Sequence, residues 1–191
     1  GRRHSVRDFY NAYELVRKSR IPVVNVDLII GLPQETEQEI AYSLEQAVKL
    51  APENLTVHTL TLKRSAPLFQ KQEQAVLTTQ AAEKMVQRAA DMATAIGLEP
   101  YYLYRQHYML GHLANIGYAK PGTESIYNIQ MMEERHPVIG VGPASASKVP
   151  LPDGHHLHKL NMPKNVAVYR VRLQELAERR RDLFNIEGTD L

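Results

Sequence analysis

A carboxylate stands in the middle of an apolar run that has the composition of a β-strand. Residues 23–30 read VVNVDLII and are followed by Gly31-Leu32-Pro33, which predicts a strand buried on both faces within a parallel sheet. Side chains alternate between the two faces of a strand, so Asp27 shares its face with Asn25 and Ile29. An ionised carboxylate accepts hydrogen bonds through two oxygens, which makes Asp27 a candidate for binding the vicinal hydroxyls of a ribose. Pairing with a buried Arg or Lys is the structural alternative.

The next strand is expected over residues 55–62, LTVHTLTL, and small side chains occupy one of its faces. That face carries Val57, Thr59, Thr61 and Lys63. Threonine leaves room for a ligand next to Asp27. It is also an ordinary strand residue, and the spacing alone favours the structural interpretation.

A third strand, expected over residues 99–105, ends in a cluster of aromatic and hydrogen-bonding side chains. The cluster comprises Tyr101, Tyr102, Tyr104, Arg105, Gln106, His107 and Tyr108. Its rings could stack on a flat ligand while Arg105 holds a carboxylate through its forked guanidinium. A half-buried strand whose tyrosine hydroxyls reach water explains the same residues equally well.

Three further motifs carry weaker signals. Residues 140–145, GVGPAS, resemble part of a dinucleotide-binding motif, but the third Gly of that motif is missing. His155, His156 and His158 follow a turn and could ligate a metal ion, although no acidic partner is evident and a solvated hairpin is the favoured interpretation. Five arginines within residues 170–181 are interleaved with Glu and Asp, which is typical of a solvated helix face.

Helices and strands alternate along the first hundred residues with short connections. Helices are expected from Ser5 for about four turns, from Thr36 to Val48, and from Thr78 or Thr79 to Ile96, with capping boxes at Ser5–Asp8 and Thr36–Glu39 and with Gly97 after the third helix. This alternation predicts a parallel α/β sheet or barrel. Only about half of a barrel is present, because the closed form needs roughly 250 residues.

The character of the chain changes after Arg105, where loops and short strands replace the regular alternation. Residues 152–154, Pro-Asp-Gly, predict a hairpin turn, and a helix is expected from Pro163 to about Leu183. We therefore expect residues 1–105 to form the half barrel and residues 106–191 an extension that packs on it, together as one structural domain.

Composition narrows the chemistry that this chain can perform. The 191 residues include no Cys, which excludes disulfides, Cys-ligated zinc, a thiolate nucleophile and an iron-sulfur cluster held by this chain alone. The net charge of +2 gives no strong field toward nucleic acid or anionic lipid. No apolar run reaches the roughly 18 residues that span a bilayer, and no signal-peptide pattern opens the chain. We expect a cytoplasmic protein with neither nucleic acid nor membrane as a partner.

Several long motifs follow one another along the chain: residues 1–5 (GRRHS), 25–33 (NVDLIIGLP) with Glu35-Thr36, and 52–58 (PENLTVH). Together they resemble the second half of the oxygen-independent coproporphyrinogen III oxidase family of radical S-adenosylmethionine (SAM) enzymes. Segments 104–106 (YRQ), 115–122 (NIGYAKPG) and 127–130 (YNIQ) resemble its coproporphyrinogen dehydrogenase branch. The resemblance runs over nearly the whole chain.

The resemblance implies the second half of a partial (β/α)6 barrel with parallel strands, followed by a loop-rich segment, a short hairpin and a C-terminal helix. In the family, SAM and a 4Fe-4S cluster lie at the open top of the barrel. By this likeness Arg2 binds the SAM methionyl carboxylate, Asp27 the ribose, and Thr61 and Ala146 the adenosyl group. The family's glycine-rich segment is changed here to residues 140–145, and its cluster-binding cysteines are absent.

The implied reaction of the parent enzyme is the oxidative decarboxylation of coproporphyrinogen III to protoporphyrinogen IX, with reduced flavodoxin or a similar protein as electron donor. Residue type and position suggest that Arg64, Tyr104, Arg105 and Lys120 hold the porphyrinogen substrate. We expect this chain alone to be inactive, and its exposed sheet edges to favour a homodimer. A haem or porphyrin chaperone without decarboxylase activity is the alternative.

Overall fold

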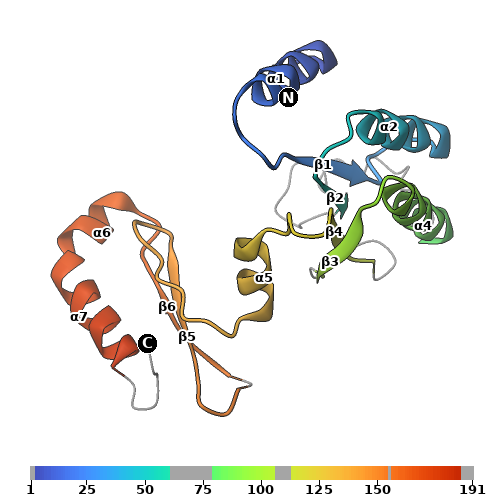
Figure 1. Ribbon diagram of the computed structural model, residues 1–191. Coiled ribbons are helices and arrows are strands. Elements are labelled where there is room, and N and C mark those ends of the chain that lie inside the picture. The colour runs from blue at the N-terminus through green and yellow to red at the C-terminus, as the bar shows by residue number, and fades with distance from the viewer. Residues whose placement is uncertain (1–2, 61–78, 106–112, 155, 186–191) are drawn as a thin grey trace. The chain divides into compact units, whose positions relative to one another are not determined.

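The computed structural model describes residues 3–60, 79–105, 113–154 and 156–185 (Figure 1). These residues form two compact units, residues 1–126 and 127–191. The sequence places a boundary at residue 105, but a strand of the first unit lies beyond that point, at Asn115–Ala119.

The first unit is built on a four-stranded sheet of β1 (Asn25–Ile30), β2 (Asn54–Thr59), β3 (Glu99–Tyr104) and β4 (Asn115–Ala119), in the order β1-β2-β4-β3. β1 and β2 are parallel, as expected. β4 is antiparallel to both of its neighbours, β2 and β3. The prediction of a wholly parallel sheet is therefore wrong. It missed β4, a strand of only five residues that returns between two parallel strands.

The helices of this unit are α1 (Val6–Lys18), α2 (Glu37–Lys49) and α4 (Thr79–Ala95). Both predicted capping boxes are present: the Ser5 and Thr36 side chains accept from the third backbone N–H of their helices, and Asp8 and Glu39 accept in return. Gly97 follows α4 with a φ of +77°, a conformation that is natural for glycine at a helix end. The three helix predictions are confirmed within a few residues.

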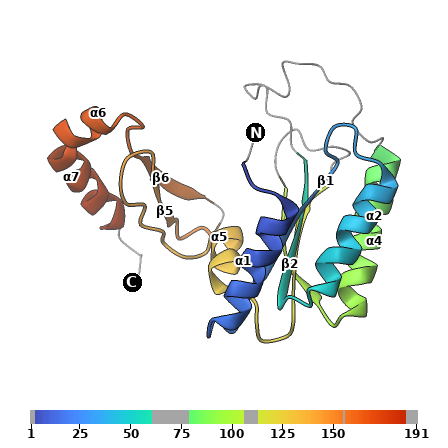
Figure 2. The same ribbon diagram turned by 90° about the horizontal axis from the view of Figure 1, so that it is seen from above.

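Helices cover one face of the sheet. α2 and α4 lie side by side along it (Figure 2), and α1 adds Tyr13 to the same core. This face buries alternate residues of β1 and β2, including Val26, Ile30 and Leu55, each at most 5% exposed. Burial of these side chains is the main source of stability for the unit.

The opposite face of β1 is open in the described part of the chain. Asn25, Asp27 and Ile29 are all exposed on it, which contradicts the predicted burial on both faces. The apolar composition of the run misled the prediction, because Ile29 is apolar and yet 46% exposed. We call this side the open face of the sheet.

The carboxylate of Glu53, just before β2, links the end of α1, the start of β1 and the end of β4. Arg17 of α1 donates to both of its oxygens, at 3.0 and 2.8 Å. The backbone N–H of Val24, just before β1, donates to Oε2 at 3.0 Å, and Lys120 Nζ after β4 lies 3.9 Å from Oε1. Burial alone would raise the pKa of Glu53, but its bonds with Arg17 and Val24 outweigh that effect and lower it.

The second unit contains α5 (Ile126–Glu133), which begins at the unit boundary, a hairpin of β5 (Ala146–Pro150) and β6 (Leu157–Asn161), and helices α6 (Val166–Val171) and α7 (Leu173–Phe184). The predicted hairpin is confirmed. Its core gathers Val149, Leu160, Met162, Leu176 and Leu183. α5, with no buried residue, was not predicted.

The single helix predicted from Pro163 to Leu183 is two helices in the structure. Asn165 caps the first, accepting from the N–H groups of Ala167 and Val168 at 2.9 and 3.2 Å. Arg172 leaves the helical conformation with ψ at 11° and separates α6 from α7. Asn165 rather than Pro163 sets the start, because its side chain supplies the acceptor that the first turn lacks.

We predict that Glu53→Gln lowers the free energy of unfolding by about 1–2 kcal/mol at neutral pH, because the charge-assisted bond to Arg17 is lost. Since the pKa of Glu53 is lowered in the fold, this stabilisation is fully present above the ordinary carboxyl pKa of about 4.3 and disappears as pH falls through the lowered value. Urea unfolding at several pH values measures both effects.

Glu14→Gln is the matched control, because Glu14 makes only an exposed pair with Lys18 at 3.8 Å. Its expected effect is near zero. Equal losses for the two variants would contradict the structural role of Glu53.

Candidate functional site

Five polar or aromatic side chains gather on the open face. The parallel register sets Asp27 beside Thr56 and Ile29 beside His58. Across β2 and β4, Thr56 lies opposite Gly117, which in turn lies opposite Tyr102 of β3. We call Asn25, Asp27, Thr56, His58 and Tyr102 the open-face cluster.

Asp27 is the charged centre of this cluster. Its Oδ1 accepts from Asn25 Nδ2 at 2.6 Å and lies 3.8 Å from His58 Nε2, and its side chain is 62% exposed. The His58 imidazole is the main cause that lowers the pKa of Asp27; partial burial opposes this, and Asn25 adds to it. Asp27 is therefore an ionised acceptor that solvent can reach. Among the described residues its partners are Asn25 and His58, and the Arg or Lys of the structural alternative is not found there.

The rest of the cluster orients Asn25. The Thr56 hydroxyl, 2% exposed as a residue, donates to Asn25 Oδ1 at 3.1 Å. With its oxygen held by Thr56, the amide of Asn25 turns its NH2 group to Asp27. Thr56 thus orients the Asn25 amide, and the amide in turn donates to one oxygen of the Asp27 carboxylate.

The Tyr102 ring closes one side of the cluster. A Cβ added at Gly117 would lie 1.9 Å from Tyr102 Cε1, so the ring rests where a larger residue would have a side chain. A bulge between Pro100 and Tyr102 also brings the Tyr101 and Tyr102 rings into an edge-to-face contact at 4.8 Å. Burial raises the pKa of the Tyr102 hydroxyl. The ring is a flat, apolar wall next to a set of hydrogen-bonding groups.

The turn after β1 is held by a second carboxylate. Glu35 accepts from the backbone N–H groups of Gly31 and Leu32 at 3.1 and 3.0 Å, and burial raises its pKa. Gly31 has a φ of +87°. This turn ends β1 sharply, three residues beyond Asp27.

Several predicted site residues lie outside the described part of the chain, namely Arg2, Thr61 and Arg64. The face of β2 predicted to lie next to Asp27 also includes Val57 and Thr59, which the structure describes. Val57 and Thr59 pair with Leu28 and Ile30, so they share the helix-covered face, and Thr59 is 3% exposed. The prediction that this face adjoins Asp27 is wrong. The register of β1 and β2 places Thr56 beside Asp27. The residues of β2 that share the face of Asp27 are therefore the even-numbered ones, whereas the prediction used the odd-numbered ones.

The proposed substrate residues do not come together. Tyr104 is the last residue of β3 and lies opposite Asn115, and the exposed Arg105 follows it. Both residues lie at the edge of the sheet where β1 and β2 end. Lys120 follows β4, which runs the other way, and its backbone N–H bonds to Glu53 O at 2.9 Å at the opposite edge. Tyr104 and Arg105 can act on one ligand, whereas Lys120 stabilises the start of β2.

Ala146, the fourth predicted cofactor residue, begins β5 in the second unit. A Cβ added at Gly140 would lie 2.4 Å from the Ala146 carbonyl oxygen. Gly140 is therefore required for the close approach of two backbone segments. The glycine-rich segment serves packing within this unit.

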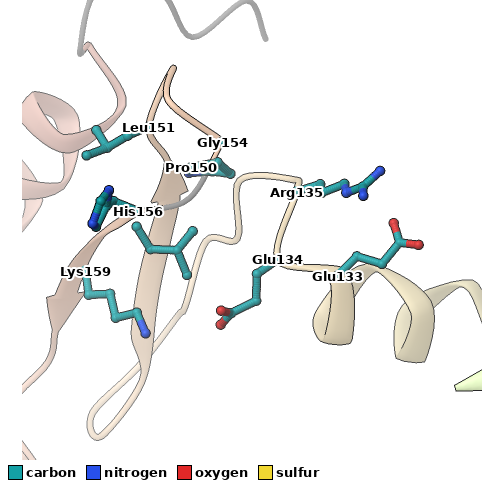
Figure 3. A pocket seen from close by; sticks show the side chains of 9 residues that line it. Glu133, Glu134, Arg135, Pro150, Leu151, Gly154, His156 and Lys159 are labelled. Carbon is teal, nitrogen blue, oxygen red and sulfur yellow. The ribbon is translucent and has the colours of Figure 1, made fainter. Parts of the chain in front are cut away.

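The second unit has a cavity of about 500 Å³ between the end of α5 and the hairpin (Figure 3). Its lining residues with ionisable side chains are Glu133, Glu134, Arg135, His156 and Lys159. His156 Nδ1 lies 2.7 Å from Asp153 Oδ2, so the expectation that this histidine lacks an acidic partner is wrong. Asp153 sits in the hairpin turn, where its other oxygen also accepts from the His156 N–H at 3.0 Å. His155 lies outside the described residues, and within these no group of three or more metal-ligating side chains occurs.

The fold of the chain is similar to part of a solved radical SAM enzyme. A solved structure described as coproporphyrinogen III oxidase (HemN) from Escherichia coli, a radical SAM enzyme, superposes with a TM-score of 0.62 at 18% identity, covering 91% of this chain and 39% of that one. At this identity the likeness shows the fold alone. The α/β class is confirmed, with a mixed sheet.

Sequence comparison then identifies a specific relative. The oxygen-independent coproporphyrinogen-III oxidase-like protein HemZ of Bacillus subtilis (strain 168) is 40% identical over 179 residues, 93% of this chain and 36% of HemZ. The heme chaperone HemW of Escherichia coli (strain K12) is 27% identical over 157 residues, 82% of this chain and 38% of HemW. No protein-family model matches the chain. The resemblance predicted from the motifs is confirmed: the chain is homologous to part of HemZ. It spans less than two fifths of the length of either relative.

Sequence reasoning found Asp27 and its face, but it missed the partners of Asp27 on β2. The available signal was the alternation of Thr56 and His58 within PENLTVH. Choosing between the two faces of β2 needs the register, and that is set by contacts outside the strand. Within the described residues, no helix has the length and apolar character to cross a membrane.

We predict that His58→Phe raises the pKa of Asp27 toward its ordinary value, because the imidazole is the main group that favours the ionised carboxylate. Carbon-detected NMR titration of the Asp27 carboxyl group measures this shift. His136→Phe, at an exposed position of the second unit, is the control and leaves the Asp27 titration unchanged. An unchanged titration in His58→Phe would show that the two side chains do not interact.

Proposed function

We propose that this chain is part of a SAM-dependent oxidoreductase of haem biosynthesis, and that its open-face cluster binds the ribose of SAM. One observation carries the proposal: Asp27 is ionised, 62% exposed and held by Asn25 on the open side of a sheet whose other side is covered by helices. A carboxylate with free acceptor capacity suits a vicinal diol. The homology to HemZ and the HemN-like fold support the same function.

The residues present fit one of the two implied cofactors. For SAM, the open-face cluster offers Asp27 for the ribose hydroxyls and the Tyr102 ring as an apolar wall beside them. For a 4Fe-4S cluster, the chain has no Cys and so no thiolate to offer. When bound, SAM and the 4Fe-4S cluster would supply the radical chemistry. The role of this chain is to bind and orient the nucleoside. The 4Fe-4S cluster would be ligated by residues outside these 191.

The substrate proposed for the whole protein is coproporphyrinogen III, in which two propionate groups become vinyl groups to give protoporphyrinogen IX. Each propionate would lose carbon dioxide, one hydrogen atom and one electron, with SAM supplying the group that takes the hydrogen atom and an external acceptor taking the electron. Tyr104 and Arg105 are the described residues that suit it. They stand at the sheet edge where β1 and β2 end, and a guanidinium there binds a propionate through two hydrogen bonds. Lys120 has no part in this proposal, because it is engaged with Glu53.

We predict that Asp27→Asn weakens the binding of S-adenosylhomocysteine, a stable SAM analogue, about tenfold, because a hydrogen bond to a charged acceptor is replaced by a weaker one. Isothermal titration calorimetry on the longest natural protein that contains this chain measures the affinity. Asp91→Asn removes an exposed carboxylate on α4 whose partner is Gln87 and serves as the control. Unchanged affinity in Asp27→Asn would overturn the ribose site.

A second candidate function, binding of haem, is favoured by the cavity of the second unit. The Asp153 carboxylate holds Nδ1 of His156, which leaves Nε2 for iron in the way that carboxylate-oriented histidines ligate metals. Lys159 lines the same cavity and could pair with a haem propionate. The similarity to HemW, a heme chaperone, supports this candidate.

We predict, for this candidate, that added haem gives a shifted Soret band that His156→Ala abolishes and Asp153→Asn weakens. The positioning carboxylate raises the basicity of the ligand, so its loss reduces affinity about 10- to 100-fold. His136→Ala is the matched control. A Soret shift that survives His156→Ala would assign the haem to another site.

A further inference from the structure

His58 stands beside Asp27 on the open face, and its imidazole is free to contact a ligand there. Its Nε2 lies 3.8 Å from Asp27 Oδ1, beyond direct hydrogen-bonding range. The side chains of His58 and Asp27 are 36% and 62% exposed. Both groups therefore face the same solvent-accessible space, and a pair of adjacent ligand oxygens could contact the two at once.

The two side chains have complementary hydrogen-bonding capacity. An ionised carboxylate only accepts, whereas Nε2 of an imidazole donates or accepts according to its protonation. A vicinal diol presents two hydroxyl groups, each of which can do both. One hydroxyl can donate to Asp27 while the other bonds to Nε2 of His58, so neither protein group is left without a partner.

The scaffold holds both groups independently of a ligand. His58 is fixed opposite Ile29 by the register of β1 and β2, and Asp27 is held by Asn25. From β3 the titratable groups near Asp27 are Tyr101 and Tyr102, and Tyr102 is partly buried over Gly117. From β4 the position in line with Asp27 and Thr56 is Gly117. Among the described side chains near Asp27, His58 thus offers a ring nitrogen that lies outside hydrogen-bonding range of the carboxylate and can share a ligand with it.

We propose that His58 is a second ribose-binding residue and that Asp27 and His58 together bind the vicinal diol at two points. This inference rests on the proposed function of Asp27. It adds a prediction that Asp27 alone does not make: affinity depends on both ribose hydroxyls, each through a different side chain.

The test compares S-adenosylhomocysteine with its 2′-deoxy and 3′-deoxy forms on the longest natural protein that contains this chain. Calorimetry measures each affinity for the unaltered protein and for Asp27→Asn, His58→Phe and His58→Gln. His58→Phe keeps a flat ring without nitrogen, and His58→Gln restores a polar donor. His136→Phe is again the matched control.

We expect His58→Phe to weaken the binding of S-adenosylhomocysteine about tenfold, the value of roughly one hydrogen bond. One deoxy form, the one that lacks the hydroxyl bound by His58, should bind His58→Phe and the unaltered protein equally. His58→Gln should recover part of the affinity. An NMR shift of the His58 imidazole on addition of S-adenosylhomocysteine gives a second readout without substitution, should His58→Phe fail to fold.

The outcomes separate the two proposals. If Asp27→Asn weakens binding and His58→Phe does not, the two-point site is wrong and the ribose site stands. The two-point site is also wrong if removing either hydroxyl of S-adenosylhomocysteine lowers its affinity for His58→Phe by the same factor as for the unaltered protein. If Asp27→Asn binds normally, or the unaltered protein binds no adenosyl compound, the ribose site itself fails and the inference with it.

Discussion

The ion pair between Glu53 and Arg17 underlies the geometry of the first unit. Glu53 immediately precedes β2, and its carboxylate holds the backbone of Val24, which precedes β1. The backbone N–H of Asn54 in turn donates to Val24 O at 3.1 Å. These bonds set Asn25 beside Asn54 and therefore Asp27 beside Thr56. A slip of one residue would turn Asp27 toward the helices and Leu28 toward solvent, so a contact at one edge of the sheet determines which side chains its open face presents.

The antiparallel strand β4 gives this face its shape. Because β2 and β4 both lie between β1 and β3, two strands separate the backbone of Asp27 from that of Tyr102. Gly117, at the position in line with both, has no side chain to fill the space. The ring can therefore lean over β4 toward the polar residues of β2. A parallel strand with a larger residue at this position would hold the ring away from the cluster.

Local patterns predicted the helices of the first unit well, and long-range strand pairing was predicted poorly. Ser5 with Asp8 and Thr36 with Glu39 make their contacts within one turn, so sequence spacing alone determines them. The face of β2 depends on its register against β1, which Glu53 sets from outside both strands. For β4, the segment NIGYA gave no strand signal, because Gly117 interrupts an already short run. Asp27 was found as a ligand candidate from its chemistry, while its partner His58 required the fold.

Two carboxylates of this unit show how pairing separates a structural role from a binding role. Glu53 receives hydrogen bonds from Arg17 on both oxygens, with Val24 N–H as a further donor, and only 16% of its side chain is exposed. Its acceptor capacity is used within the protein. Asp27 receives one hydrogen bond within the described residues, from Asn25 on Oδ1, and its nearby imidazole favours the charge without occupying the oxygens. A guanidinium in place of His58 would saturate Asp27 as Arg17 saturates Glu53. An imidazole at 3.8 Å lowers the pKa of the Asp27 carboxyl group and leaves the carboxylate able to accept from a ligand.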